Sequence, residues 1–340
     1  MDNKTAWQSL IEGDAVLIEK TSEQVVKYSL GTENTALYCC ILWPGILLWA
    51  NDVRDKYLPV NEDVNMSFVT INYCLEGRCE AGAGGRDVFV YMKPGMLCID
   101  NHRPPDGYHY PSGKYKGIEF AFLIDETQGG FPDELEQIGI HLRDIDSMLD
   151  AAKGTFMGGI SEELHESMED LYDHLTAGDI SIEECRYCSI RILYGLLHGE
   201  CRREEIKSYI TKGQRAIAND VEERITADLS EHHVIADLAA DYGVSASAVK
   251  KYFEAVYGDN ISGYLRTRRM ELARKMLEES DLSVGEISSA AGYSHQGKFG
   301  KAFKDFTGLT PLEYRRQNYM KGRNHEDCQD GASPGVGHGE

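Results

Sequence analysis

The sequence predicts an α+β protein with a β-rich front part, a helical middle part and an all-α end that contains two helix-turn-helix units. Three observations support this prediction. Short apolar or alternating runs fill residues 36–124, apolar residues recur at helical spacing from about 131 to 210, and one helical pattern occurs twice between 234 and 308. With 340 residues, 42% hydrophobic and 27% charged, the chain is long enough for two globular domains.

Six runs in the front part have the length and pattern of β-strands. They are bounded by turn sequences such as Pro44-Gly45 and Pro94-Gly95. Many short strands separated by such turns are typical of a barrel or a sandwich. The runs are ALYCCILW, GILLWA, MSFVTINYCLEG, DVFVYM, MLCID and YKGIEFAFLID.

The middle part is predicted to be helical and to connect the front part to the all-α end. The predicted helices begin at Pro132-Asp-Glu-Leu, run from Ile160 to Leu175 with a Ser161-Glu-Glu-Leu start, and run from Ile182 to Tyr209. Residues 321–340 contain Gly, Asp, Ser, Pro and His without apolar anchors, so we expect a disordered tail.

Charge is distributed unevenly along the chain. The net charge of −21 argues against a nucleic-acid binder when it is taken whole. However, residues 1–212 account for −17 of this charge, whereas residues 213–320 carry only −2. Within 245–275, seven basic residues stand against three acidic ones. A local positive surface is therefore possible in the last third, and the local field is what a phosphate meets.

Cysteine usage and hydropathy indicate a cytoplasmic protein. The nine cysteines form an odd, scattered set, so we expect reduced and mostly buried thiols. The start of the chain lacks a basic segment followed by an apolar one, and no stretch approaches the roughly 18 apolar residues of a membrane helix. We therefore expect no membrane association.

Residues 234–258 have the pattern of a helix, a three-residue turn and a second helix. Ala239 is small at the point where two crossing helices come close, and Gly243 lies where the turn needs a left-handed backbone. Ser245 is predicted to be the N-cap of the second helix. Tight helical hairpins share these requirements, so the single unit is only moderately specific for a helix-turn-helix.

The same pattern occurs a second time, which makes chance a poor explanation. The offset is 49 residues for the first two pairs and 50 for the last three, so the second turn is predicted to be one residue longer. The matching residues are Leu238, Gly243, Val249, Phe253 and Gly258, which correspond to Ile287, Gly292, Phe299, Phe303 and Gly308.

Residues 261–280 are predicted to form one rigid helix that fixes the separation of the two units. We expect its apolar stripe to consist of Ile261, Leu265, Leu272 and Met276. Its basic residues lie elsewhere on the helix and are Arg266, Arg268, Arg269 and Lys275.

The stretch from about 213 to 317 resembles the DNA-binding domain of the AraC/XylS family of bacterial transcriptional regulators. The matching motifs are RRMELARKML, AAGYSHQGKFGKAFKDFTG and the closing GLTPLEYRR, and the resemblance covers about 105 of 340 residues. It implies that the second helix of each unit enters one of two successive major-groove segments, about 34 Å apart. It also implies a homodimer that binds operator or promoter DNA, usually as an activator that works with RNA polymerase.

The resemblance places base-reading positions in both second helices. Lysine can reach guanine and glutamine can pair with adenine, so these residue types suit direct readout. Glycine at 297 and 300 offers no side chain and should cost the second recognition helix up to about 1 kcal/mol per position relative to Ala. We therefore predict weaker base discrimination by the second unit. The candidate DNA-binding residues are Ser247, Lys250, Lys251, Gln296, Gly297, Lys298 and Lys301, together with Arg268 and Arg269 of the connecting helix.

The front part weakly resembles the cupin-like effector barrel that this family often carries. Such a barrel can enclose a small molecule, and aromatic side chains are frequent here. The candidate effector-binding residues are Trp43, Trp49, Tyr73, Tyr91 and Tyr110. The predicted organisation is a cupin-like effector-sensing domain at 1–130, a helical dimerisation region at 131–212, a DNA-binding domain at 213–320 and a disordered tail at 321–340.

Other functions receive less support from the residues. His102 and His109 are too few and too far apart for a good metal site, so we expect no metal and no cofactor. Cys185 and Cys188 are predicted to share one helix face, whereas Cys74 and Cys79 flank a turn and could approach each other. A thiol- or metal-responsive regulator, or a cupin enzyme fused to a DNA-targeting domain, remains the alternative. We expect no enzymatic activity, because no nucleophile motif or phosphate-binding loop is found.

Overall fold

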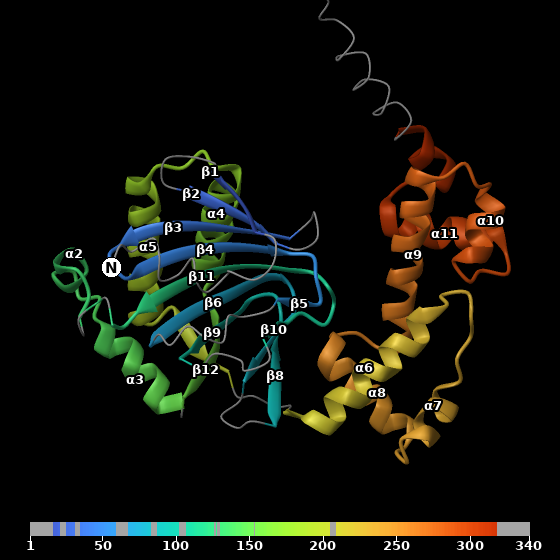
Figure 1. Cartoon of the computed structure of the whole chain (residues 1–340), viewed down its shortest axis with the longest axis horizontal. Helices are drawn as coiled ribbons and strands as arrows, with labels where there is room; N and C mark the ends of the chain where they lie inside the picture. Colours follow the sequence, from blue (N-terminus) through green and yellow to red (C-terminus); the bar gives the residue numbers. More distant parts are fainter. Residues whose placement is uncertain are drawn as a thin grey trace, which may run out of the picture. The chain divides into compact units, whose positions relative to one another are not determined.

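The structure of the protein is a computed structural model (Figure 1). It describes residues 16–20, 25–30, 35–58, 67–82, 87–101, 107–125, 127, 130–152, 154–204 and 209–317. The described residues up to Gln214 form one compact unit, to which Ala255–Gly258 is also assigned, and the remainder from Arg215 form a second unit. The predicted tail at 321–340 lies outside the described residues.

The first unit contains a nine-stranded sheet in which every pair of neighbours is antiparallel. All six predicted runs form strands, and five of them belong to this sheet. Its order is β1 (Val16–Lys20), β2 (Val25–Leu30), β3 (Thr35–Trp43), β4 (Ile46–Val53), β11 (Tyr115–Leu123), β6 (Phe68–Gly77), β9 (Met96–Asp100), β12 (Thr155–Ile160) and β13 (Cys201–Arg203).

Two small sheets accompany the large one. The sixth predicted run, DVFVYM, forms β8 (Val88–Met92), which pairs on one side with β7 (Cys79–Gly82) and on the other with β14 (Ile210–Thr211). The other small sheet pairs β5 (Tyr57–Leu58) with β10 (Tyr108–His109).

The predicted closed barrel is wrong for the part of the chain that the structure describes. β1 and β13 are the two edges of the nine-stranded sheet, and no described strand joins them. Each face of the sheet packs against other elements, so the sheet does not need to close into a barrel to bury its apolar side chains. One face packs on helices, and the other packs against the small sheets.

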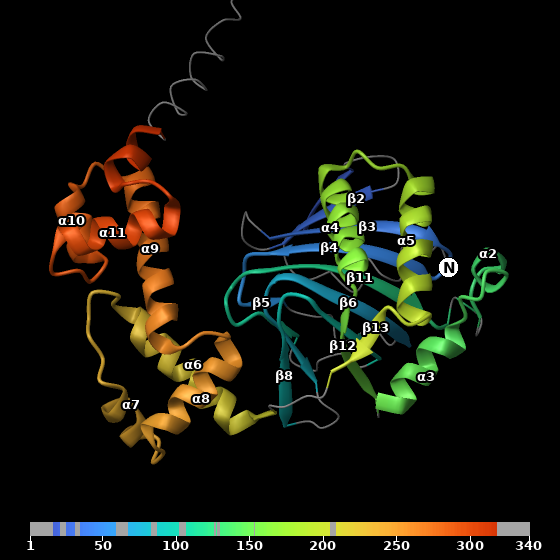
Figure 2. The ribbon, with the colours of Figure 1, turned by 180° about the vertical axis from the view of Figure 1, so that it is seen from behind.

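The helical middle part covers one face of the sheet, as Figures 1 and 2 show for α4 and α5. Its elements are α2 (Asp133–Glu136), α3 (Leu142–Ala152), α4 (Glu162–Ala177) and α5 (Ile182–Leu197). Ser161 caps α4 as predicted, with its side chain accepting from the Leu164 N–H. The helix predicted to reach Tyr209 instead ends at Leu197, where Gly199 takes a φ of 109°. The region predicted to be helical, 131–212, also contains three described strands, β12, β13 and β14.

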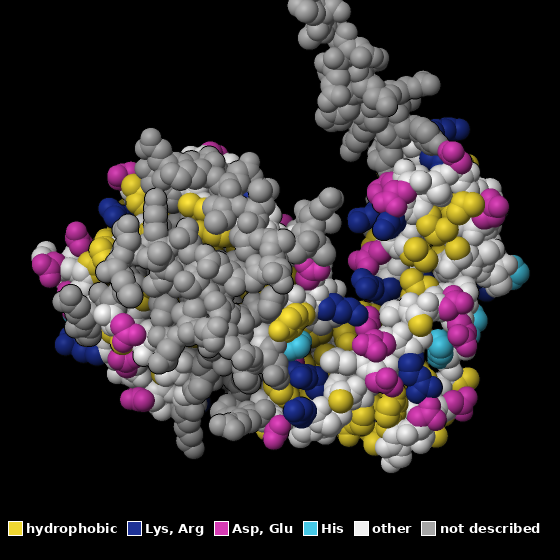
Figure 3. Space-filling model, in the orientation of Figure 1, with side chains coloured by type: hydrophobic (Ala, Val, Ile, Leu, Met, Phe, Trp, Pro, Cys, Tyr) yellow, Lys and Arg dark blue, Asp and Glu magenta, His cyan; other side chains and the backbone are white. Residues whose placement is uncertain are grey.

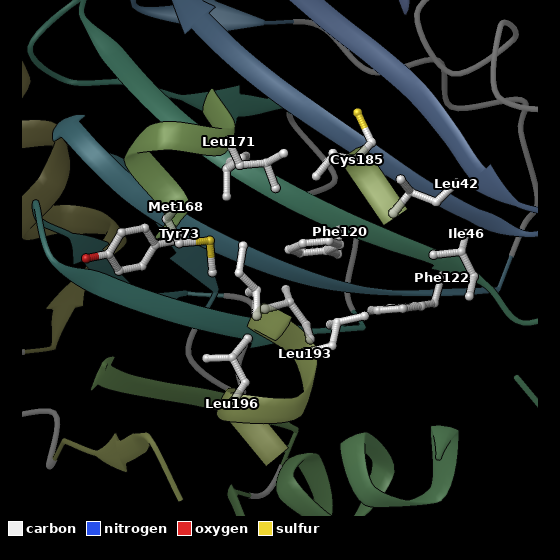
Figure 4. Close-up of a cluster of buried hydrophobic side chains, with 14 of the residues drawn as sticks. Leu42, Ile46, Tyr73, Phe120, Phe122, Met168, Leu171, Cys185, Leu193 and Leu196 are labelled. Carbon is white, nitrogen blue, oxygen red and sulfur yellow. The ribbon is translucent and has the colours of Figure 1, made fainter. Parts of the chain in front are cut away.

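Sheet and helices share one hydrophobic core (Figure 4). Phe120 and Phe122 of β11 meet Met168 and Leu171 of α4 and Leu193 of α5 in this core. The residues predicted as separate regions before and after position 131 therefore fold around a common core. The burial of these apolar side chains is the main source of stability for a sheet with one helix-covered face.

Two polar contacts fix the helices on the sheet. Arg186 of α5 donates from Nε to the Leu42 carbonyl at 2.6 Å and lies 5.5 Å from the centre of the Trp43 ring. On α4, His165 Nδ1 lies 2.8 Å from the Tyr73 hydroxyl. Both contacts satisfy polar groups that the hydrophobic layer would otherwise leave unpaired.

The second unit is all-α among its described residues. The helices that lie wholly or mostly in it are α6 (Lys212–Ala227), α7 (Ile235–Asp241), α8 (Ala246–Tyr257), α9 (Ile261–Glu279), α10 (Val284–Ala290) and α11 (Gln296–Thr307), and residues 311–317 are also helical. The predicted connecting helix is therefore confirmed as α9. None of the described helices in the chain combines the length and apolar character needed to cross a membrane.

Candidate nucleic-acid interface

The first turn joins α7 to α8 through four residues, one more than predicted, and depends on local chemistry. Gly243 takes a φ of 65°, which glycine adopts without the steric cost that a Cβ adds. Ser245 caps α8, because its hydroxyl accepts from the Ala248 N–H at 3.2 Å. Ala239 is buried, at 1% exposure, where the two helices approach. These three predicted roles are confirmed.

The second turn joins α10 to α11 through five residues, so it is one residue longer, as the offsets predict. Gly292 takes a φ of 75°, and a Cβ on it would lie 2.6 Å from the Leu229 carbonyl oxygen. A capping box starts α10: Ser283 accepts from the Glu286 N–H, and the Glu286 carboxylate accepts from the Ser283 N–H. Gly292 thus suits the second turn both by its backbone conformation and by its close approach to the Leu229 carbonyl.

α9 holds both units by burying a different face at each end. Near its start, Tyr264 packs edge-on against Phe253 of α8, with ring centres 5.3 Å apart. Further along, Met270, Ala273 and Leu277 pack in one cluster with Phe299 and Phe303 of α11. The predicted stripe is therefore only partly right: Ile261 is buried, but Leu265, Leu272 and Met276 are half-buried at the margins of the two contacts.

A buried polar contact links α9 to α6. Tyr264 donates from its hydroxyl to Glu222 Oε1 at 2.8 Å, and Glu222 is only 1% exposed. Desolvation and the neighbouring carboxylate raise the pKa of the Tyr264 hydroxyl, so it stays a donor. A buried carboxylate needs such a donor. The contact also holds α6 against α9.

The closing motif GLTPLEYRR docks on the second unit. Thr310 and Glu313 form reciprocal N-cap hydrogen bonds around Pro311, which starts the last helical segment. Tyr314 then donates to Glu278 of α9, and Arg315 donates to the Leu282 carbonyl at 2.6 Å. The residues of this motif therefore stabilise the loop between α9 and α10.

The candidate base-reading residues all lie on exposed surfaces of α8 and α11. Ser247, Lys250 and Lys251 share one face of α8, because they are spaced by three and four residues. Gln296, Gly297, Lys298 and Lys301 are exposed on the first half of α11. Within the described ranges no ion pair holds any of the four lysines. These cations are available to a ligand.

The two helices do not present equivalent surfaces. Applying the 50-residue offset, Lys251 corresponds to Lys301, whereas Lys250 corresponds to Gly300. Lys304, which sequence reasoning missed, is exposed on the same face of α11 as Gly297 and Lys301, at spacings of seven and three residues. Its helical position could have identified it. On the face drawn in Figure 3, Lys and Arg side chains are interspersed with Asp and Glu side chains over the second unit.

Arg268 and Arg269 have contacts within the protein. Arg268 donates to Glu271 at 3.1 Å and lies over the Tyr264 ring. Arg269 donates to the Leu229 carbonyl at 2.8 Å and to the Glu231 carbonyl at 3.2 Å, which holds the loop before α7. The structure therefore places these two candidates in the scaffold, apart from the exposed lysines.

The five candidate effector-binding aromatics do not line a single site. Trp43 and Tyr73 lie in the core between sheet and helices, whereas Trp49 and Tyr110 lie in the cluster on the opposite face of the sheet. Tyr91 of β8 donates to Glu80 at 2.6 Å. A sheet separates the first pair from the second, so one small molecule cannot touch all five.

The described residues give little support to a metal site or to a reactive cysteine. No group of three or more His, Cys, Asp or Glu side chains there could hold a metal ion, and His102 lies outside them. Cys74 and Cys79 are free, buried thiols. Burial raises the pKa of Cys74 to about 12 and the pKa of Cys79 well above its usual value. Both thiols therefore stay protonated, the form that reacts poorly. Cys185 and Cys188 share helix α5, as predicted.

Residues 238–317 match a protein-family model described as a helix-turn-helix domain. An uncharacterized HTH-type transcriptional regulator of Escherichia coli (strain K12), YijO, is 24% identical over 75% of this chain and 84% of its own length. The HTH-type transcriptional regulator ExsA of Pseudomonas aeruginosa is 27% identical over 30% of this chain and 38% of its own length.

A solved structure of the DNA-binding domain of AdpA, in complex with a target DNA, is 25% identical over 31% of this chain and 94% of that chain, with a TM-score of 0.29. Apart from YijO, the chain spans only 30% to 38% of the length of the first relatives that it matches.

The two glycines of α11 generate a stability prediction. A Cβ at Gly297 or Gly300 would meet nothing within 4 Å, and neither residue has a positive φ. Gly297→Ala and Gly300→Ala should therefore each stabilise the second unit by up to about 1 kcal/mol. Urea unfolding followed by circular dichroism measures the change. Gly308→Ala is the control and should destabilise, because Gly308 has a φ of 80°. Destabilisation by the α11 substitutions would contradict this account.

Proposed function

We propose that this chain, a transcriptional regulator with a DNA-binding helix-turn-helix domain of the AraC type, reads operator DNA with α8 and α11 and responds to a small effector bound by its front part. The observation that carries the proposal is the pair of turn units packed on one connecting helix. Each unit exposes unpaired lysines on its second helix.

The exposed residue types support readout in the major groove. Lys250, Lys251, Lys298 and Lys301 can donate to guanine or to phosphate, and Gln296 can pair with adenine. Gly297 and Gly300 remove side chains from the second helix, so we assign it the weaker base discrimination. Arg268 and Arg269 are left out of the proposed interface because they hold the scaffold.

Activation is the proposed outcome, with RNA polymerase as a partner. Two relatives of the chain are named transcriptional activators: NphR of a Rhodococcus species and VirF of Yersinia enterocolitica. An effector that favours one state of the front part changes operator affinity, and operator binding then changes effector affinity by the same factor.

A homodimer is the proposed assembly, with α5 as its contact. Tyr187 and Tyr194 are 75% and 47% exposed, and they lie seven residues apart on the same side of this helix. Exposed aromatic residues at helical spacing are typical of a helix that packs on another protein. The α4 surface beside it is acidic and less suited to self-association.

Lysine substitutions test the proposed readout. Lys250→Ala should weaken binding to the operator by about tenfold and should weaken binding to scrambled DNA much less, because a base contact is lost. Lys298→Ala should have a smaller effect on discrimination, because the second helix has fewer side chains for readout. Fluorescence anisotropy with a promoter fragment found by genome-wide mapping measures both affinities.

Lys275→Ala is the matched control for these lysines. Lys275 is exposed on α9 and lies near Glu279, so its removal changes charge without touching α8 or α11. Wild-type affinity of Lys250→Ala on both DNAs would refute the assignment. An equal loss of affinity for operator and scrambled DNA would show that Lys250 contacts phosphate and not a base.

A double variant tests the dimer. Tyr187→Ser with Tyr194→Ser should give a monomer at concentrations where the wild type sediments as a dimer, because the aromatic contact is removed. Tyr209→Ser is the control, since Tyr209 is 53% exposed and lies outside α5. Analytical ultracentrifugation decides the matter, and a monomeric wild type or a dimeric double variant would overturn the proposal.

A further inference from the structure

One row of paired residues crosses the sheet on the face opposite α4 and α5. Each residue in the row lies directly beside the next on the neighbouring strand. The row contains one carboxylate, Glu119, near its middle. In order it runs Cys39 of β3, Trp49 of β4, Glu119 of β11, Asn72 of β6, Cys98 of β9 and Met157 of β12.

The described neighbours of Glu119 in this row and cluster are apolar or neutral. Trp49 and Cys98 are 7% and 4% exposed, and both belong to the buried cluster on this face together with Tyr110 and Tyr115. Tyr110 and Tyr115 are near enough to Glu119 for its charge to raise their pKa values. A carboxylate is therefore enclosed between the large sheet and the small sheets.

Within the described part of the chain, the Glu119 carboxylate makes no hydrogen bond and no ion pair. The neighbouring Tyr115 hydroxyl is used elsewhere, because it donates to Asn72 Oδ1 at 2.7 Å. Gly117 permits this arrangement, since a Cβ on it would lie 2.3 Å from the Tyr115 hydroxyl. Burial alone raises the pKa of Glu119 to about 7. An enclosed carboxylate without a donor is costly unless a ligand supplies one.

Glu119 as a residue is not fully covered. It is half-buried, whereas its neighbours in the row on β4 and β9 are buried. Part of this residue is therefore accessible to a small molecule. Aromatic rings at Trp49, Tyr110 and Tyr115 surround this place, and such rings attract cations.

We propose that Glu119 anchors the effector of this regulator and that the effector is a small organic cation, an amine whose ammonium group pairs with Glu119 and whose apolar body packs on Trp49. This inference rests on the proposed function, which requires an effector in the front part. An ammonium group supplies the donors and the charge that Glu119 lacks, whereas an anion would be repelled.

Thermal shifts of the full chain at pH 8 test the ligand class. The probes are butylamine and benzylamine, with butanol, benzyl alcohol and benzoate as uncharged and anionic counterparts. At least one amine should raise the Tm in a dose-dependent way, and its counterparts should not. Equal shifts by an alcohol, a shift by benzoate, or no shift by either amine would overturn the proposal.

Substitution of Glu119 tests whether the thermal shift caused by the amine depends on this residue. Glu119→Gln keeps the shape but removes the charge, so the amine shift should disappear. Glu166→Gln is the matched control on the exposed surface of α4 and should retain the shift. An amine shift that survives in Glu119→Gln would overturn the assignment.

The pH dependence gives a readout that needs no ligand. The folded pKa of about 7 lies above the value of the unfolded chain, so the folded state binds the proton more tightly. The contribution of this carboxyl to stability is therefore complete below about pH 4.5 and is lost as the pH rises through about 7. The nearby Cys79, Cys98, Tyr110 and Tyr115 have raised pKa values and do not titrate in this window.

Glu119→Gln should accordingly be more resistant to urea than the wild type at pH 8, and this advantage should shrink at pH 5. If the difference in urea stability between Glu119→Gln and the wild type were the same at pH 5 and pH 8, the enclosed placement of Glu119 would be overturned. Promoter binding is measured on the same samples. Intact promoter binding without an amine response overturns only the effector class, whereas absent promoter binding by the wild type overturns the regulator.

Discussion

The packing of both helix-turn-helix units on α9 is the constraint on which the proposed reading of DNA depends. Phe253 of α8 packs against Tyr264 near one end of α9, and Phe299 and Phe303 of α11 pack against Met270 and its neighbours further along. A continuous helix kinks sharply only at a proline, a glycine pair or a group inserted into its hydrogen bonds. The spacing of α8 and α11 is therefore set by the length of α9 between the two contacts.

The turns of the second unit were predictable because their determinants are local. Gly243 and Gly292 have positive φ, and Ser245 caps the helix that follows it, so each role depends on residues within a few positions. The duplication adds a second signal, because two copies that share the same offsets must share the same geometry. The exposed lysines of α8 and α11 follow from helical periodicity once the turns are placed.

Features of α9 that depend on tertiary contacts were not predictable. A helix packed on two units buries two faces, so a single apolar stripe misplaces the core: Met270, Ala273 and Leu277 are buried, and Leu265 and Leu272 lie at the margins. Arg268 and Arg269 resemble surface cations in the sequence. Their partners, Glu271 and the carbonyls of Leu229 and Glu231, are known only from the fold.

In the front part, strand positions could be predicted but not the architecture. Whether a sheet closes depends on pairing between residues far apart in the chain, which alternation of apolar residues does not encode. β12 was missed because TFMGGI is short, contains two glycines and lies between helices. Glu119 was missed because only the pairing of β4, β11 and β6 shows that this carboxylate lies beside Trp49 and Asn72.

The most direct test of the central claim changes the DNA and leaves the protein intact. Five base pairs, half a helical turn, are inserted between the two segments that one protomer protects in its promoter, and the affinity of the full chain is measured. A rigid α9 predicts that affinity falls to the level of scrambled DNA, because the second major groove then faces away from α11. Unchanged affinity would show that the two units move independently, and it would contradict the account.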